Sequence, residues 1–225
     1  MRKEMVFISA ICCAFSSLAC NQTSELSREE IFEKLAELDP QESDLVFDVP
    51  EGWSNNLLAD ARVIYVTDGE NIDSANKAID GLPLTIWKSN NYQVNTEIIF
   101  DLQVQRQFNK LVVYNLHTDA RGSGGGNNAL KQFQLFISSE LNEKSFIPIG
   151  EFTLTAPKEV CFSQKGGGHI CAFINNKKPD VFDLDEINAR TIKIVLQSAY
   201  WKEAARDEWK SFALSEIMLF HSCRD

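Results

Sequence analysis

After Pro50 the apolar residues of this chain alternate with polar residues at a period of two, and the pattern continues almost to the end. A period of two places successive side chains on opposite faces of a β-strand. Eight such segments are rich in Val, Ile, Phe or Tyr. The predicted strands are 62–66, 97–102, 110–116, 132–137, 146–154, 169–173, 191–196 and 212–220. This pattern predicts an all-β fold, an antiparallel β-sandwich or jelly roll.

A helical pattern precedes the strands. Ser27, followed three residues later by Glu30, is typical of a helix capping box. Three apolar residues then fall on one helical face, namely Ile31, Leu35 and Leu38. Pro40 cannot continue a helix, so it ends the run. We therefore expect a short N-terminal amphipathic helix that docks on the domain or forms a stalk.

The first 19 residues resemble a secretory signal. A basic pair precedes the apolar run 5–18, which is short for a membrane span. Leu18-Ala19-Cys20 resembles the end of a bacterial lipoprotein signal, in which the cysteine is acylated. Ordinary cleavage after Ala19 is the alternative.

Three regions follow from these patterns: a signal peptide at 1–19, a polar spacer and short helix at 20–45, and the sandwich domain at 46–225. The expected location is the bacterial cell envelope, at the outer membrane or the periplasmic or outer surface. Lipid on Cys20 would tether the exported chain there.

The formal net charge of −10 limits the possible partners. Nucleic-acid binding needs basic patches that release phosphate counterions, so nucleic acid is not an expected partner. Broad adsorption to anionic lipid is disfavoured for the same reason. We expect membrane association only through the N-terminal lipid.

Two cysteines flank a glycine-rich turn at 165–169. A hairpin there would bring Cys161 and Cys171 together, and an exported chain can keep a disulfide. We expect this bridge, with two free buried thiols as the alternative. No Cys-x-x-Cys repeat indicates zinc, and Cys223 is left over.

A compact loop at 76–87 crowds oxygen donors together. Asp80-Gly81 and Pro83 mark tight turns, Thr85 adds a hydroxyl, and Trp87 supplies a large apolar anchor. Hard oxygen donors in a short turn are the ligands that calcium prefers. A plain turn without metal is the alternative.

The order of seven segments resembles that of a known family. The segments are 56–59, 76–87, 97–102, 108–113, 131–138, 191–196 and 214–220. Together they are similar to a coagulation factor 5/8 type C (discoidin-like) domain, in the galactose-binding-like superfamily that includes family 32 carbohydrate-binding modules. The resemblance spans about residues 46–222.

This resemblance implies a structural calcium ion. Its ligands would be the carbonyl oxygens of Lys77 and Ser215, both oxygens of Thr85, and the carboxylates of Asp80 and Glu216. One residue departs from the family pattern, because Leu82 occupies a position that often holds Asp or Asn. A smaller set of side-chain ligands lowers calcium affinity.

The resemblance also implies a ligand site on the loops beside this calcium-type loop. A sugar needs an aromatic ring under its apolar face and planar polar groups around its hydroxyls. The candidates are Tyr92, His117, Arg121, Tyr200, Trp201, Arg206 and Trp209. As alternatives, Trp201 and Trp209 pack on the sandwich and His117 only ends a strand.

Catalytic motifs are missing from the sequence. It has no Gly-x-Ser-x-Gly, His-Glu-x-x-His or Walker motif, and it has three histidines. The first hypothesis is therefore a non-catalytic module that binds carbohydrate at the cell envelope. The alternative is a protein-interaction or adhesion module that uses the same loops to bind a surface protein without sugar affinity.

Overall fold

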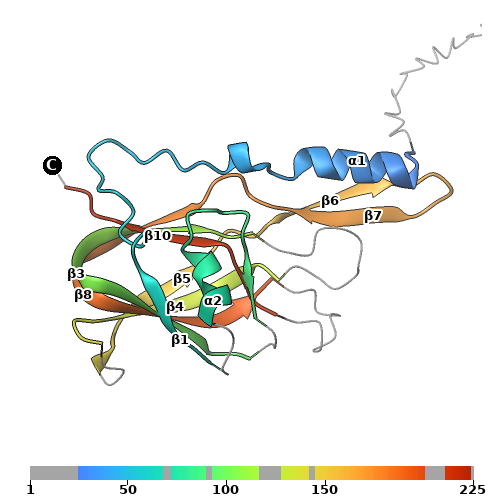
Figure 1. Ribbon diagram of the computed structural model, residues 1–225. Coiled ribbons are helices and arrows are strands. Elements are labelled where there is room, and N and C mark those ends of the chain that lie inside the picture. The colour runs from blue at the N-terminus through green and yellow to red at the C-terminus, as the bar shows by residue number, and fades with distance from the viewer. Residues whose placement is uncertain are drawn as a thin grey trace, which may run out of the picture.

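The computed structural model describes residues 25–67, 72–89, 93–116, 128–141, 145–200 and 211–223. The helices are α1 (Arg28–Leu38) and α2 (Ile72–Ala75), with short 3-10 helices η1 (Glu42–Asp44) and η3 (Asn76–Ala78). The strands are β1 (Arg62–Val66), β2 (Trp87–Lys88), β3 (Thr96–Tyr114), β4 (Leu130–Ser138), β5 (Ile147–Thr153), β6 (Lys158–Ser163), β7 (His169–Ile174), β8 (Asp180–Ala199), β9 (Ala213–Leu214) and β10 (Glu216–Phe220). All strand-to-strand pairings among these elements are antiparallel, which confirms the predicted fold class (Figure 1). None of the described helices has the length and apolarity that crossing a bilayer requires.

Two long strands, β3 and β8, form the centre of the sandwich. The first half of β3 pairs with the second half of β8, and their other halves also pair with each other. The register shifts between Asp101 and Arg106, where Gln103 has a positive φ of 66°. β1, β4 and β5 extend the layer on one side of this bend, and β10 extends the layer on the other side. One hydrogen-bonded ladder thus folds over into two layers.

The main core lies between these layers. Phe100, Phe133 and Leu196 come from the first layer, whereas Leu111 and Leu219 come from the second, and all are buried. Their spacing follows the period-two pattern of the sequence, because alternate residues of a strand face the same side. Burial of these side chains is the main force that holds the layers together.

A second cluster covers the outer face of β10 and β3. Residues 45–53, which we call the strap, cross this face between η1 and β1. Phe47, Trp53 and Phe220 pack with ring centroids 5.5 to 6.1 Å apart. Tyr114 lies beneath them and is 1 % exposed. The strap therefore ties the N-terminal region to the sandwich.

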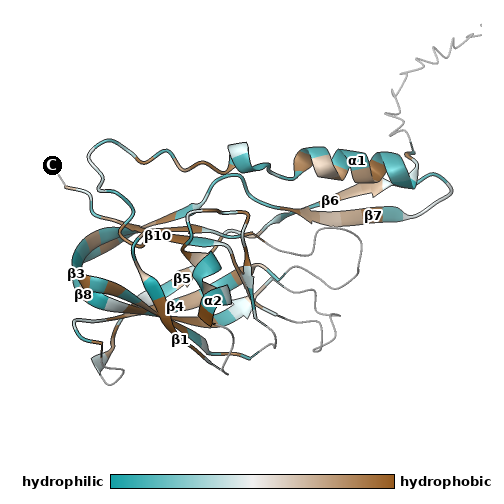
Figure 2. Cartoon of the chain, in the orientation of Figure 1, coloured by the Kyte–Doolittle hydropathy of each residue, from teal (hydrophilic) through white to brown (hydrophobic). Residues whose placement is uncertain are grey.

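Helix α1 packs on the β6–β7 hairpin, which projects from the sandwich (Figure 1). Ser27 and Glu30 form the predicted capping box, and Ile31 and Leu35 are buried on the hairpin side. Figure 2 shows both polar and apolar residues on this helix, and its buried residues Ile31 and Leu35 lie on one face, as in an amphipathic helix. The short N-terminal helix is thus confirmed as a docked element.

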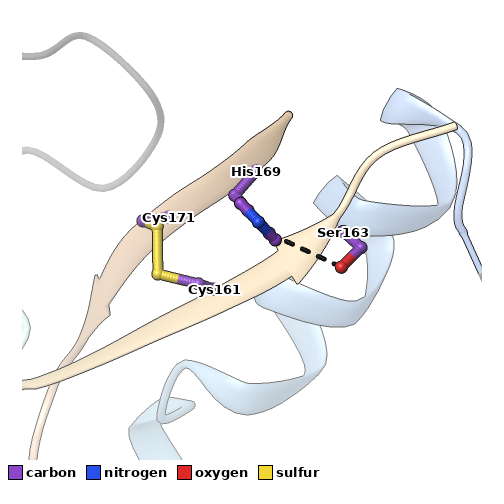
Figure 3. Close-up of a disulfide and its surroundings, with 4 residues drawn as sticks. All are labelled: Cys161, Ser163, His169 and Cys171. Atoms are coloured by element: carbon purple, nitrogen blue, oxygen red, sulfur yellow. Dashed lines mark hydrogen bonds between the residues drawn. A yellow bond between two sulfur atoms is a disulfide. The ribbon is translucent and has the colours of Figure 1, made fainter. Parts of the chain in front are cut away.

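The hairpin carries a disulfide on its other face (Figure 3). Cys161 and Cys171 pair directly across the two strands. Their neighbours Phe162 and Ile170 pack toward α1, so the alternation of a strand places the sulfur atoms on the opposite side. His169 and Ser163 share that face, with Nδ1 and Oγ 3.5 Å apart.

The structure corrects several sequence-based boundaries. The predicted strands 97–102 and 110–116 are parts of one strand, β3. No strand is predicted between 173 and 191, but β8 already begins at Asp180. Asp183, Asp185 and Glu186 give this first half of β8 its loop-like composition, yet they are exposed because the half lies at an edge of its layer. Strand β6 was missed, and the predicted strand 212–220 is divided into β9 and β10.

Candidate functional site at the loop rim

Three chain segments, 90–92, 117–127 and 201–210, begin and end at one end of the sandwich. Hydrogen bonds join their flanking residues. The Ser89 N–H donates to the Phe212 carbonyl at 3.0 Å, and the Phe212 N–H donates to Ser89 Oγ at 2.8 Å. The Ala213 N–H donates to the Asn128 carbonyl at 2.8 Å, and Asn128 Nδ2 lies 3.3 Å from Ser211 Oγ. We call these joined ends and their segments the loop rim.

Tyr200 is the one predicted ligand residue within the described part of the chain. Its N–H donates to the Ala129 carbonyl at 2.9 Å, and its hydroxyl donates to the Leu154 carbonyl at 2.5 Å. Lys131 Nζ lies 5.9 Å from the centre of its ring. Burial, and then the charge of Asp180, raise the pKa of Tyr200. The ring is therefore held in a fixed, half-buried position at the rim.

The remaining predicted ligand residues lie outside the described residues. They are Tyr92, His117, Arg121, Trp201, Arg206 and Trp209. Cys20, the predicted lipidation site, also lies outside them. The structure thus describes the base of the rim.

The calcium-type loop lies beside the rim because β2 pairs with β9. Trp87 is opposite Leu214 in this short ladder and is 0 % exposed. The loop ends at Trp87, and Ser215 follows Leu214 directly. The ladder therefore carries the loop and the start of β10 to the same place, with Trp87 as the expected apolar anchor.

Asp80 organises the interior of this loop. Its Oδ1 accepts a hydrogen bond from the Leu82 N–H at 2.9 Å. Thr85 Oγ1 lies 2.8 and 2.6 Å from the two carboxylate oxygens of Asp80. A carboxylate that accepts from the backbone two residues on is the usual stabiliser of such turns. The side chains of Asp80 and Thr85 consequently face each other.

Strand β10 supplies the other wall. The Gly81 N–H donates to Oε2 of Glu216 at 3.1 Å, and the Ser215 hydroxyl donates to the Pro83 carbonyl. Glu216 is completely buried. Four of the five predicted metal ligands are therefore gathered here: Asp80, Thr85, Ser215 and Glu216. The fifth, Lys77, lies in η3, which also contacts β10.

The buried carboxyl of Glu216 is only partly satisfied. Among the described residues, no hydrogen-bond donor reaches its Oε1. Burial, and then the nearby charge of Asp80, raise the pKa of Glu216 to about 8, although the N–H groups of Gly81 and Leu82 oppose this shift. Two carboxyl groups and a hydroxyl around an orphaned oxygen form a donor set that fits a hard cation.

The Gly81 N–H is the contact that the sequence did not reveal. Gly81 has a φ of 79°, which suits glycine, so the Asp-Gly pair correctly indicated a turn. The pair carried no information about the acceptor, because Glu216 is 135 residues away in the sequence. The resemblance named both carboxylates, but not this bond.

Comparison with protein families gives one match, to the F5/8 type C domain, over residues 60–212. The chain belongs to the F5/8 type C domain family. The matched residues include the calcium-type loop and most of the rim, so both lie within the family domain. Strand β10 and α1 lie outside the matched range. No curated protein matches the chain.

Several solved structures resemble this F5/8 type C domain. The family 32 carbohydrate-binding module (CBM) of Clostridium perfringens NanJ, in complex with galactose, has 13% identity and a TM-score of 0.48, covering 75% of this chain and 99% of that one. CBM32-1 from a family 31 glycoside hydrolase of the same organism has 16% identity and a TM-score of 0.46, covering 74% and 97%. The C-terminal domain of a Bacteroides fragilis chitobiase has 19% identity and a TM-score of 0.46, covering 73% and 96%. Family membership therefore rests on the sequence match.

Proposed function

We propose that this F5/8 type C domain is a non-catalytic module that binds carbohydrate at the loop rim. One observation carries the proposal: hydrogen bonds fix the ends of three segments together, beside a loop that β10 holds in place. The segments contain aromatic and planar polar residues: Tyr92, Trp201 and Trp209, with His117, Arg121 and Arg206. These side-chain types suit the apolar face and the hydroxyl groups of a sugar. Membership of the F5/8 type C family supports this choice.

A binding role without catalysis is consistent with the burial of Glu216. Glu216 has a pKa that could serve a general acid near neutral pH. However, it is 0 % exposed and lies behind Gly81, so a substrate has no access to it. Its environment supports a structural role.

That structural role is to hold a calcium ion. The carboxylates of Asp80 and Glu216 and the hydroxyl of Thr85 would bind it, with the carbonyl oxygens of Lys77, Ser215 and Thr85 as further donors. When bound, the ion would supply positive charge to two carboxylates that otherwise repel each other. Leu82 is 48 % exposed and its side chain adds no ligand. Asp80 and Glu216 would join the loop to β10 through the ion.

The module is proposed to act at the cell envelope, anchored by lipid on Cys20. The signal-like sequence of residues 1–19 supports this location. Fractionation of cells that express the wild type or Cys20→Ser tests it. We expect the wild type in the membrane fraction and the variant released from it; an equal distribution would exclude the lipid anchor.

Glycan arrays, followed by calorimetric titration with galactosides, N-acetylglucosamine and polysaccharides, test the binding function. We expect Trp201→Ala and Trp209→Ala to bind glycan more weakly, because each variant lacks the aromatic ring that stacks against the apolar face of the sugar. Phe146→Ala is the matched aromatic control, since Phe146 lies at the opposite end of the β4–β5 pair. Unchanged binding in both tryptophan variants would contradict the assigned site.

Protein capture in the presence of free sugars distinguishes the alternative function from carbohydrate binding. If no glycan binds, and capture of envelope or host proteins is insensitive to free sugars, the loops form a protein-interaction or adhesion site. Capture that free sugar abolishes would instead support the carbohydrate site.

A further inference from the structure

A groove of about 650 Å³ opens on the side of the sandwich, between β5 and β8. Its lining consists of residues 148–152 of β5 and of Asp183, Leu184, Asp185 and Ile187 of β8. None of these residues belongs to the loop rim or to the calcium-type loop. The groove is therefore separate from the proposed carbohydrate site.

The groove follows the edges of two strands. Successive residues of a strand face opposite sides, so a groove that touches all of 148–152 must run along the edge of β5. On its other edge β5 pairs with β4, and β5 ends the strand order in the described part of the chain. β4 reaches β8 only from Thr191 onward, so residues 183–187 have β3 as their described strand partner. The groove thus lies between the edges of the two layers, along the edge of β5 to which a strand could be added.

The floor of the groove is apolar. Leu184 and Ile187 are each 5 % exposed. The Phe152 ring packs 5.3 Å from Phe133 and 5.0 Å from Phe182, measured between ring centroids. These side chains offer an apolar surface to alternate residues of an incoming strand, whose other residues would face away from the floor.

The charge of the groove has one sign. Among the described residues, Glu151, Asp183 and Asp185 line it, and no Lys, Arg or His does. Two of these carboxylates already have a neighbour: Asp183 pairs with Lys110, and Gln132 Nε2 lies 3.4 Å from Glu151. Asp185 is exposed. A positively charged occupant is favoured because charges across an interface are complementary in sign.

We propose that this groove binds an extended basic segment of a partner polypeptide, which adds as a strand to the edge of β5. A second copy of this chain is disfavoured, because its net charge of −10 repels an acidic groove. A neutral glycan has no positive charge, and an amino sugar has no strand backbone to pair with. Pro148 offers no N–H, so pairing uses the residues that follow it. Gly150 has no side chain to obstruct the approaching backbone.

The test uses the full chain and a fluorescent peptide of alternating lysine and valine, about eight residues long, a usual strand length. Binding is measured by anisotropy at low and high salt. A glutamate–valine peptide and a lysine–valine peptide with N-methylated valines serve as probe controls. The first reverses the charge, and the second keeps the charge but removes backbone donors.

We expect the lysine–valine peptide to bind, and both control peptides to bind far more weakly. Glu151→Gln and Asp185→Asn should each raise its Kd about twofold to fivefold, the range for exposed charge pairs. Glu33→Gln is the matched control, because Glu33 is exposed on α1 and outside the groove. Trp201→Ala should leave peptide binding unchanged, which separates this site from the loop rim.

Three results would overturn the proposal. The first is no binding of the lysine–valine peptide at low salt. The second is equal binding of the N-methylated peptide, which would show that acidic charge alone attracts the probe. The third is displacement of the peptide by glucosamine oligosaccharides with loss of that displacement in Asp185→Asn, which would make the groove an amino-sugar site.

Discussion

The Gly81 N–H donates to Oε2 of Glu216 at 3.1 Å across 135 residues of sequence. This bond joins the calcium-type loop to Glu216, the first residue of the last strand. Because Glu216 is buried and its other oxygen has no donor among the described residues, the stability of this junction depends on the charge of one carboxyl group. Calcium binding should therefore stabilise this junction, whereas a rise in pH without calcium should destabilise it.

Calcium should stabilise the domain against heat. At a calcium concentration of 100 times Kd, the gain in the free energy of unfolding is about 2.7 kcal/mol. Glu216→Gln and Asp80→Asn should lose most of this gain, because each removes a negative ligand. Differential scanning calorimetry with calcium or with a chelator measures it. Glu33→Gln is the control and should respond as the wild type does; a wild type with the same Tm in both buffers would exclude the ion.

Without calcium, stability should fall as pH rises from about 4.5 to about 8. Glu216 has a folded-state pKa of about 8, above its ordinary value of 4.5, so the folded state binds more protons in this window. The free energy of unfolding then decreases with pH, by up to about 1.4 kcal/mol per pH unit. The stabilisation is complete below 4.5 and is lost as pH passes 8.

Urea unfolding of the wild type and of Glu216→Gln in chelator, at several pH values, isolates this effect. The difference between the two curves should carry the slope, because every other titrating group is common to both. Parallel curves would show that Glu216 has an ordinary pKa.

Tyr114 offers a substitution that should not destabilise the protein. Burial, and then the charge of Asp48, raise the pKa of Tyr114 to about 12, and no described group bonds its hydroxyl. An unpaired buried polar group costs about 1–3 kcal/mol, so Tyr114→Phe should leave the free energy of unfolding unchanged or raise it by about 1 kcal/mol. Tyr200→Phe is the matched opposite: it removes a bond to Leu154 and should cost about 1 kcal/mol. Urea unfolding of both variants checks the sign.

Reduction of the Cys161–Cys171 disulfide should destabilise the β6–β7 hairpin and the helix α1 packed on it, and should leave the sandwich intact. The bridge closes a loop with a sequence separation of 10, for which chain entropy predicts about 3 kcal/mol. Since α1 packs on the other face of the hairpin, its amides should lose protection from hydrogen exchange, whereas those of β3 should not. Exchange with and without a dithiol reductant, in a Cys223→Ser background, measures this. Equal losses in α1 and β3 would contradict it.

Local patterns in the sequence identified much of the fold. Alternation found β1, β4 and the second half of β8, and the Ser27–Glu30 spacing found α1. These features depend on neighbouring residues. The continuity of β3 through both layers could not be predicted from neighbouring residues. The bend lies at Gln103, where no Gly or Pro indicates a turn.

The site was predictable only where family order could be followed. The family resemblance of segments 76–87 and 214–220 predicted Asp80 and Glu216 as ligands of one site, and the structure brings the two residues together. The residues of the ligand loops follow no regular pattern from which their positions can be predicted. The charged residues in the first half of β8 resemble a loop in composition, although this half is a strand. Two features depend on long-range packing and have no local sequence signal. They are the hydrogen bond from Gly81 to Glu216, and the placement of the β5 and β8 edges on either side of the groove.

β3 and β8 pass from one layer into the other without leaving the hydrogen-bonded ladder. Neither layer can slide over its partner unless the covalent backbone of both strands is rearranged at the bend. Mechanical load that enters through either layer is therefore shared by both. The sandwich thus forms a continuous frame that holds the flanking residues of the loop rim at a constant spacing.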